Sequence, residues 1–234
     1  MTSDAALRAS GIWARIGELE VLRGIDLEVR AGRVVGLLGP SGAGKSTLFR
    51  ALAGEIAPSR GEVFIAEREV SRWPLWRRAR AGLGYVPQTP SVLLDLSVAD
   101  HIESFQRAAR ARRRDGRELA ERAGLADRLE VRAGELSGGE RRRLEILRAL
   151  VGEPRVLLCD EPFAALDPAG AALVSGLLRE LSQNGAAVIL ADHRVRDALE
   201  ICDEAVLLVD GRIAVRAPAD RFALEEAVRE RYLG

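Results

Sequence analysis

Residues 39–47 have the residue types and spacing of a phosphate-binding loop. A short apolar run precedes this segment and a helical pattern follows it, a context that a chance glycine-rich turn would not explain. Glycines let several backbone N–H groups surround anionic oxygens, and the following helix directs the positive end of its dipole at them. We therefore predict a nucleotide phosphate site built from Gly39, Pro40, Ser41, Gly42, Ala43, Gly44, Lys45, Ser46 and Thr47.

Lys45 is the only lysine among the 35 basic residues, and all the others are arginine. This exception indicates that position 45 needs a compact ammonium group rather than a planar guanidinium. In a phosphate-binding loop such a lysine reaches the β- and γ-phosphates, and the hydroxyl group of the next residue binds Mg²⁺. The sequence therefore predicts Lys45 as a phosphate ligand and Ser46 as a magnesium ligand.

A second motif, residues 156–161, places two carboxylates after four apolar residues. Such a pattern is typical of a buried strand that delivers Asp160 and Glu161 to its carboxyl end, where doubly wound sheets hold their ligands. Asp160 suits the coordination shell of Mg²⁺, and Glu161 could polarise a water molecule for in-line attack. Alone the pattern is weak, because many strands end this way. Together with residues 39–47 it becomes a strong signal.

The third motif is residues 136–140, in which Ser137 and Glu140 have the spacing of a capping box at the start of a helix. The simplest interpretation is a well-capped helix. However, Gly138 and Gly139 are poor residues with which to begin a helix, unless another group must approach the backbone closely. The N–H groups there could bind a second phosphate chain.

Strand and helix patterns alternate along most of the chain, which predicts an α/β fold with a mainly parallel sheet. The stretch from about residue 97 to 152 is different, because it has helical periodicity and no convincing strand. We therefore predict a single domain over residues 1–234. Its core occupies about 1–88 and 153–234, and a helical subdomain of about 89–152 is inserted between them.

Composition limits the function classes. The 234 residues carry 35 basic and 35 acidic side chains, so the formal net charge of zero gives no support to a bulk nucleic-acid binder. The apolar runs are too short to span a bilayer, and no apolar segment follows Met1, so we expect no secretory signal. Cys159 and Cys202 do not form a CxxC pair, which argues against a disulfide framework or a zinc ribbon and favours the cytoplasm.

Together these motifs resemble those of the nucleotide-binding subunits of ABC transporters, and the resemblance covers essentially the whole chain. Three further residues match family motifs: Gln88 the Q-loop, Asp167 the D-loop and His193 the switch histidine. Residues 140–145 and the ending Tyr232, Leu233 and Gly234 are most similar to the ATPases of lipopolysaccharide export. The ATPases of branched-chain amino-acid importers share this ending and are the closest alternative.

The resemblance implies a P-loop NTPase core with a mainly parallel sheet and N-terminal antiparallel strands, plus the inserted helical signature subdomain. It also implies a head-to-tail homodimer that binds two ATP molecules. Each ATP would lie between residues 39–47 of one subunit and the signature of the other, which is formed by Leu136, Ser137, Gly138, Gly139 and Glu140.

The family roles, transferred residue by residue, make Glu161, His193 and Gln88 the catalytic side chains. Glu161 would polarise the attacking water, His193 would contact the γ-phosphate, and Gln88 would sense Mg²⁺ and that water. Ser46, Gln88 and Asp160 would surround the metal, and Asp167 would act across the dimer.

The resemblance further implies separate transmembrane subunits as partners and a location on the cytoplasmic face of the membrane. A soluble ABC ATPase that acts on ribosomes or chromosomes is the alternative from another class. Ribosomal types carry two cassettes and chromosomal types insert long coiled coils, and this single cassette has neither. The sequence does not identify the transported substrate.

Three features depart from the family pattern. Ile16 stands where an aromatic residue usually stacks on adenine, so we expect it to contact the base without a ring. Leu93, Leu94 and Asp95 replace the aromatic and basic residues expected in the groove for the membrane partner. The run at 107–117 is shorter and more basic than the family pattern; we expect it to form a solvated helix face, and contact with anionic lipid is the weaker alternative. We also expect His101 to be a solvated helix residue.

Overall fold

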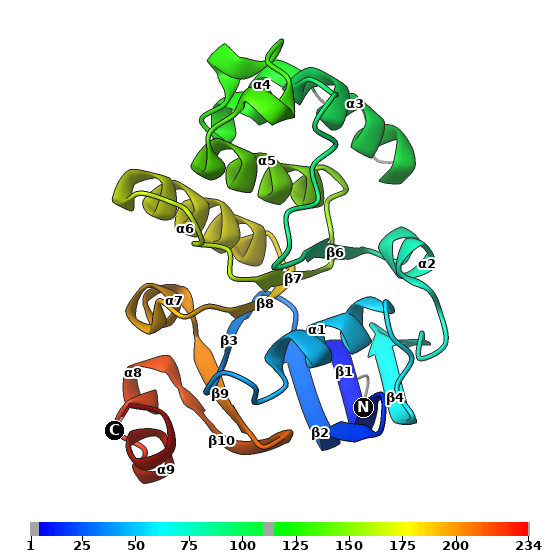
Figure 1. Ribbon diagram of the computed structural model, residues 1–234, viewed down its shortest axis with the longest axis vertical. Coiled ribbons are helices and arrows are strands. Elements are labelled where there is room, and N and C mark those ends of the chain that lie inside the picture. The colour runs from blue at the N-terminus through cyan, green and yellow to red at the C-terminus, as the bar shows by residue number, and fades with distance from the viewer. Residues whose placement is uncertain (1–4, 110–114, 234) are drawn as a thin grey trace.

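The computed structural model describes residues 5–109 and 115–233 (Figure 1). A six-stranded sheet in the order β10-β9-β3-β8-β7-β6 forms the centre, and a four-stranded antiparallel sheet in the order β2-β1-β4-β5 lies beside it. Strands β3, β6, β7, β8 and β9 are mutually parallel, while β10 is antiparallel to β9. The predicted α/β fold with a mainly parallel sheet and N-terminal antiparallel strands is confirmed.

The parallel strands are short and apolar because helices or the second sheet cover both of their faces. Every residue of β3, β7 and β8 is buried. The central sheet consists of β3 (Val34–Leu38), β6 (Leu83–Val86), β7 (Val156–Asp160), β8 (Ala187–Ala191), β9 (Glu204–Val209) and β10 (Arg212–Pro218). Since β8 lies between β3 and β7, the loops that follow these three strands emerge side by side at one edge.

The antiparallel sheet is formed by β1 (Ala5–Ile16), β2 (Leu19–Arg30), β4 (Arg60–Ile65) and β5 (Arg68–Glu69). Strand β1 alternates between buried and partly exposed residues along much of its length, as expected for a strand with one face on the core. Helix α1 (Lys45–Ala53) lies across this sheet, and its buried Leu48, Phe49 and Leu52 join the same core cluster.

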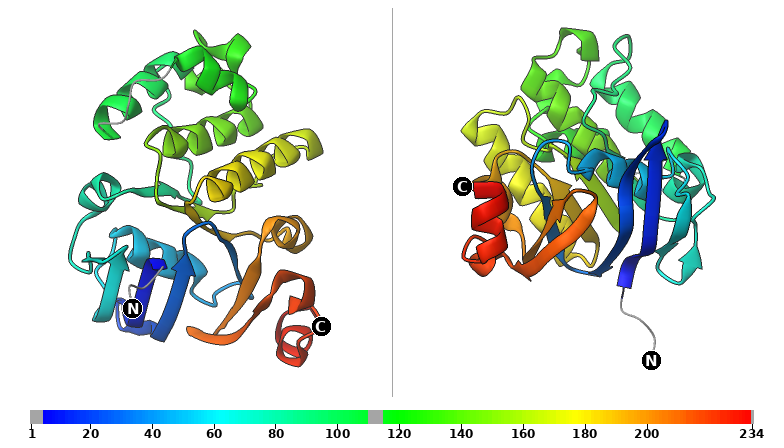
Figure 2. Two further views of the ribbon diagram at one scale, coloured as in Figure 1. Left: turned by 180° about the vertical axis from the view of Figure 1, so that it is seen from behind. Right: turned by 60° about the horizontal axis from the view of Figure 1, so that its bottom comes forward.

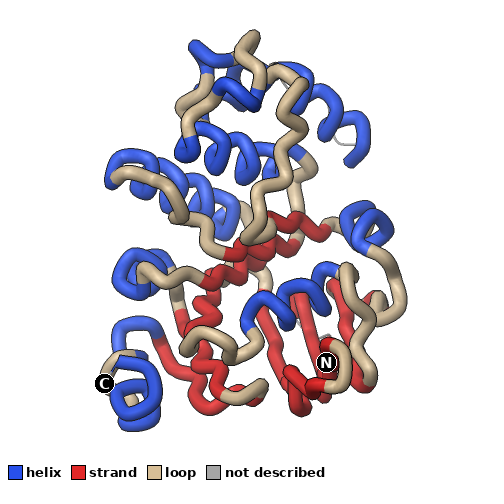
Figure 3. Tube along the Cα trace, viewed as in Figure 1, coloured by secondary structure: helices blue, strands red, loops and turns tan. Residues whose placement is uncertain are grey.

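The helices of the inserted region lie together as a layer at the top of Figures 1 and 3, and the last of them packs against the edge strand β6. They are α3 (Val98–Ala109), α4 (Gly116–Arg122) and α5 (Gly138–Val151), with the short turns η1 (Ala126–Arg128) and η2 (Ala133–Glu135). This layer has its own hydrophobic cluster, which includes Ile102, Leu119 and Leu144. The predicted boundaries near 89 and 152 agree with this arrangement and remain a proposal. Part of the basic run at 107–117 falls outside the described residues.

The remaining helices cover the flanks of the central sheet (Figure 2). They are α2 (Leu75–Arg80), α6 (Pro168–Gln183), α7 (Val195–Ile201), α8 (Ala219–Phe222), α9 (Glu226–Val228) and the terminal turn η3 (Arg229–Leu233). Phe163, Phe222 and Val228 are buried in the cluster on this side. No helix within the described ranges has the length and apolarity needed to cross a membrane.

Candidate nucleotide-binding and active site

The phosphate-binding loop connects β3 to α1 and depends on glycine backbone geometry. Gly42 and Gly44 have φ angles of 80° and 106°, and a Cβ atom on Gly39 would lie 2.1 Å from the carbonyl oxygen of Leu208. Gly44 occupies the N-cap of α1, and no side chain caps this helix start. The first N–H groups of α1 are therefore available to anionic oxygens.

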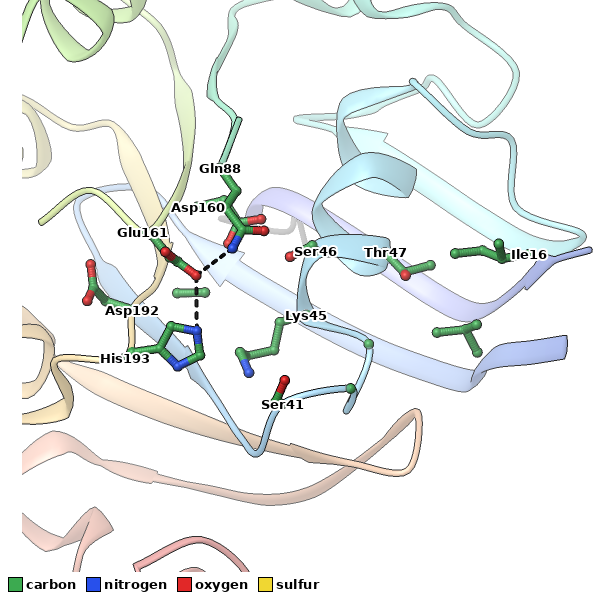
Figure 4. A pocket seen from close by; sticks show the side chains of 14 residues that line it. Ile16, Ser41, Lys45, Ser46, Thr47, Gln88, Asp160, Glu161, Asp192 and His193 are labelled. Carbon is green, nitrogen blue, oxygen red and sulfur yellow. Dashed lines mark hydrogen bonds and ion pairs between the residues drawn. The ribbon is translucent and has the colours of Figure 1, made fainter. Parts of the chain in front are cut away.

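Lys45, the first residue of α1, extends its side chain along the loop. Its Nζ atom donates to the carbonyl oxygens of Gly39 at 2.6 Å and Pro40 at 2.9 Å. Burial lowers the pKa of Lys45, and the negative charges of Asp160 and Glu161 oppose that shift. Figure 4 shows Lys45 extending into the cavity beside Ser41. The ammonium group is thus held where a phosphate chain would meet it.

Asp160, the last residue of β7, is buried and accepts a hydrogen bond from Ser46. Burial raises its pKa, the neighbouring Glu161 adds to the rise, and Ser46, Lys45 and Arg142 oppose it. The hydroxyl group of Ser46 and this carboxylate provide hard oxygen donors. That donor set fits Mg²⁺, which proteins commonly bind through one or two side chains while phosphates and water complete the shell.

Glu161 follows β7 and contacts side chains from the loops after the two neighbouring strands, β6 and β8. Its Oε1 atom accepts a 2.7 Å hydrogen bond from Nε2 of Gln88 and lies 3.0 Å from Nε2 of His193 (Figure 4). Its backbone has a φ of 56°, an uncommon value for a residue with a side chain, and its N–H donates to Ala191 at 2.7 Å. The loops after β6, β7 and β8 thus bring together the three predicted catalytic residues.

Two residues that the sequence analysis did not assign hold this arrangement in place. Arg142 on α5 donates to the carbonyl oxygens of Asp160, Pro87 and Glu161, the last two at 2.9 Å. Asp192 accepts N–H groups from Phe163 and Arg194. Arg142 is nearly fully buried although it lies in an arginine run, and only its pairing with Glu145 three residues later could have indicated this.

These side chains surround a cavity of about 240 Å³. Ile16 and Val21 line it at the end away from Glu161, as Figure 4 shows for Ile16. Trp13 does not line it, and its ring lies instead against Gly24. The described lining residues are Ile16, Val21, Ser41, Gly42, Gly44, Lys45, Ser46, Thr47, Gln88, Asp160, Glu161, Ala191, Asp192 and His193.

The residues predicted to act across a dimer lie elsewhere in the same chain. Ser137 caps α5: its Oγ accepts from the N–H of Glu140 at 3.2 Å, and its own N–H donates to Oε2 of Glu140 at 2.8 Å. Asp167 caps α6 by accepting from the N–H of Gly170 at 2.8 Å. Residues 136–140 and Asp167 are absent from the described lining of the cavity.

Comparisons with known proteins agree with this geometry. A family model described as ABC transporter matches residues 22–164. The chain belongs to the ABC transporter family. Among its relatives is the lipopolysaccharide export system ATP-binding protein LptB of Acidithiobacillus ferridurans, 38% identical and covering 97% of this chain and 96% of its own. The protein of that name from Escherichia coli K12 is 34% identical, with 98% of each chain covered.

Solved structures support the same assignment of fold. A nucleotide-free ATP-binding cassette of an ABC transporter superposes with a TM-score of 0.85 at 25% identity, covering 98% of this chain and 99% of its own. A dimeric ATP-binding cassette bound to ADP and phosphate gives a TM-score of 0.80 at 24% identity, covering 91% and 98%. The protein is therefore an ATP-binding and ATP-hydrolysing subunit of an ABC transporter.

A second cavity of about 350 Å³ lies between the core and the helical layer of this ABC ATPase. Apolar and aromatic side chains of α2, β6, α3 and α5 dominate its lining, including Leu75, Trp76, Tyr85 and Phe105. Leu93 and Leu94, the predicted groove residues, are both 55% exposed. They do not line this cavity. The loop that precedes them contacts two of its lining residues, because Ser91 hydrogen-bonds to Arg148 and Glu145.

The expectation that His101 is solvated is wrong, because the residue is fully buried in α3. Its Nε2 accepts the N–H of Leu93 at 3.0 Å, and Nδ1 lies 2.8 Å from the carbonyl oxygen of Ser97. These two bonds require the neutral ring with its proton on Nδ1. A lone histidine in a helical pattern carries no signal for this role, because its partners are backbone atoms of a neighbouring loop.

Proposed function

We propose that two copies of this protein bind ATP between them and use its hydrolysis to drive transmembrane subunits that export a lipopolysaccharide-type substrate. The observation that supports the dimer is that the two groups of predicted ATP-binding residues lie apart in one chain. The cavity holds the phosphate-binding loop and the catalytic carboxylate, while the capped start of α5 is solvent-exposed and outside the cavity. A second copy related by a two-fold axis would place its Ser137, Gly138 and Gly139 over the phosphates.

The proposed reaction is in-line transfer of the γ-phosphate to water. Lys45 and the N–H groups of residues 39–47 bind the β- and γ-phosphates, and Ser46, Asp160 and Gln88 surround the metal position. Mg²⁺ bound there would neutralise charge that develops on the phosphate oxygens. Glu161 orients and polarises the attacking water, His193 contacts the γ-phosphate, and Asp167 of each copy contacts the other copy.

The substrate class rests on the named relatives of similar length at 38% and 34% identity. The partner surface rests on the second cavity, because an apolar groove with aromatic walls suits a short helix of a membrane subunit. Trp76, which is 60% exposed, belongs to its lining. The exposed Leu93 donates its N–H to His101 on α3, one helical turn from the lining residue Phe105. Binding there would place the protein on the cytoplasmic face of the membrane.

A mixed dimer tests the shared site. One chain carries Ser137→Arg, which blocks its signature, and the other carries Lys45→Ala, which removes its phosphate ligand. Each variant alone has no complete site in a homodimer, whereas the mixture contains one complete site per heterodimer. We expect the mixture to regain up to about one half of the wild-type activity per heterodimer. A mixture as inactive as its components, with heterodimers shown by tagged pull-down, would refute the proposed site.

A further inference from the structure

Arg128 lies next to the start of α5, although it belongs to the turn η1. Its Nε atom is 2.9 Å from Oε1 of Glu140. The other carboxylate oxygen of Glu140 accepts the N–H of Ser137 at 2.8 Å and completes the capping box. The Glu140 side chain is only 18% exposed and that of Arg128 is 51% exposed. The carboxylate of Glu140 therefore takes part in the cap of α5 and also pairs with Arg128, a cation from outside that helix.

The carboxylate of Glu140 stabilises the start of α5 but would repel an anionic ligand bound there. It accepts a backbone N–H, and it stabilises the helix through the dipole. The bond to Arg128 first, and the cap second, lower the pKa of Glu140 to about 2, so the group is ionised at any working pH. If this helix start receives the triphosphate of a second copy, the negative charge of Glu140 repels the ligand that the helix dipole attracts.

We propose that Arg128 is a positioning residue of the shared ATP site, which neutralises Glu140 so that an acidic cap can face a triphosphate. The inference rests on the dimer of the proposed function and assigns a role to a residue outside the motifs. The side chain of Arg128 acts through Glu140. Removing it leaves the carboxylate, its bond to Ser137 and its charge in place, but takes away the cation with which Glu140 is paired in the described part of the chain.

The test is a double-mutant cycle on ATP-dependent dimerisation. The four proteins are the Glu161→Gln parent, which should retain ATP, and the same chain with Arg128→Gln, with Glu140→Gln, or with both. Glutamine can occupy the third position of a capping box, so Glu140→Gln removes the charge and keeps an acceptor for Ser137. Light scattering with saturating Mg-ATP gives the dimer dissociation constants, at two salt concentrations.

We expect Arg128→Gln to weaken dimerisation about tenfold, which corresponds to ~1.4 kcal/mol. Adding Glu140→Gln should restore the dissociation constant to within about threefold of the parent, and salt should reduce the defect of the single variant. The matched control is Arg107→Gln, which breaks the exposed pair of Arg107 with Glu103 on α3 at 2.7 Å. That control should dimerise like the parent.

Two results would overturn the inference. In one, Arg128→Gln dimerises like the parent. In the other, it weakens dimerisation but Glu140→Gln does not restore it, so that Arg128 acts on the fold or on the nucleotide directly. Thermal melting of all four proteins distinguishes an effect of Arg128 on the fold, which lowers the melting temperature, from a direct effect on the nucleotide, which does not. If the parent itself forms no ATP-dependent dimer, the proposed function fails first and the inference falls with it.

Discussion

The side-chain amide of Gln88 donates a 2.7 Å hydrogen bond to Oε1 of Glu161, which joins the end of β6 to the end of β7. Gln88 begins the segment that leads into the helical layer, so the position of this layer and the orientation of the carboxylate are linked. Arg142 strengthens the link, because it runs from α5 to the carbonyl oxygens of Pro87 and Glu161. A movement of the helical layer would change the position of the proposed catalytic base.

The first prediction concerns that base. Glu161→Gln should still bind Mg-ATP but hydrolyse it about 10²–10⁴-fold more slowly, because an amide cannot accept the proton of the attacking water. Single-turnover hydrolysis and nucleotide binding are measured on the same preparation. Lys45→Ala is the contrasting variant and should weaken binding and hydrolysis together. Wild-type turnover by Glu161→Gln would show that Glu161 does not have the proposed role.

The second prediction concerns nucleotide selectivity. Ile16 and Val21 offer apolar contact at the base end of the cavity but no aromatic ring. Stacking of a base on a ring contributes roughly 1–3 kcal/mol in nucleic-acid binders. We therefore expect little preference among ATP, GTP and CTP in competition binding, and tighter ATP binding by Ile16→Tyr. A hundredfold preference of the wild type for ATP over GTP would contradict this and point to another residue that contacts the base.

Sequence reasoning located the parts of the site that depend on local patterns. The loop at 39–47, the carboxylates at the end of β7 and the capped start of α5 are contiguous motifs. The hairpin of β9 and β10 also has a local signal, because Asp210 and Gly211 form a two-residue turn of a type typical of hairpins, with φ angles of 50° and 73°. Convergence of Gln88, Glu161 and His193 followed from the family resemblance, because these residues come from distant strands that the topology brings together.

The long-range contacts of buried charged residues were not predictable in this way. Arg78 is fully buried and donates to four backbone carbonyl oxygens, those of Trp73, Ala51, Leu52 and Ser71. Two of these acceptors lie in the last turn of α1, so Arg78 caps the helix that begins with Lys45. Burial lowers its pKa to about 10. Because the acceptors are main-chain atoms, no residue type in the sequence indicates the contact, and arginine itself favours the surface.

The third prediction concerns pH and His101. Burial lowers the pKa of this residue below its ordinary value of 6.5, Arg148 acts in the same direction, and the Ser97 carbonyl and Asp100 oppose them. The unfolded chain therefore binds more protons at this position than the folded chain does. The stability that His101 contributes is present above pH 6.5 and decreases as the pH falls below that value, by at most about 1.4 kcal/mol per pH unit.

Urea unfolding at several pH values measures this effect. In His101→Gln a carbonyl oxygen can accept the N–H of Leu93 without titrating, so the loss of stability between pH 7.5 and 5.5 should be smaller than in the wild type. The control is Leu224→Ala, which changes an exposed side chain without a titratable group and should keep the wild-type dependence. An identical slope for the wild type and His101→Gln would show that His101 does not titrate in this range.

The last prediction concerns the membrane partner. Leu93 and Leu94 are each 55% exposed, whereas Val92 packs against the core of the helical layer. Exposed apolar anchors suit a helix of a transmembrane subunit, and truncating one such anchor can cost ~2 kcal/mol or more of binding. Leu93→Ala combined with Leu94→Ala should therefore abolish transport and association with membranes that contain the partner subunits.

The isolated double variant should keep its ATPase activity and most of its melting temperature, because neither side chain fills the core. Leu224→Ala is the control, since Leu224 is 69% exposed and lies between α8 and α9, on a different part of the molecule. It should associate with the membrane subunits like the wild type. An unfolded double variant would show that these leucines stabilise the helical layer. The family resemblance implies basic residues where Asp95 follows the anchors, so we also expect the wild-type protein not to replace a lipopolysaccharide-export ATPase in cells.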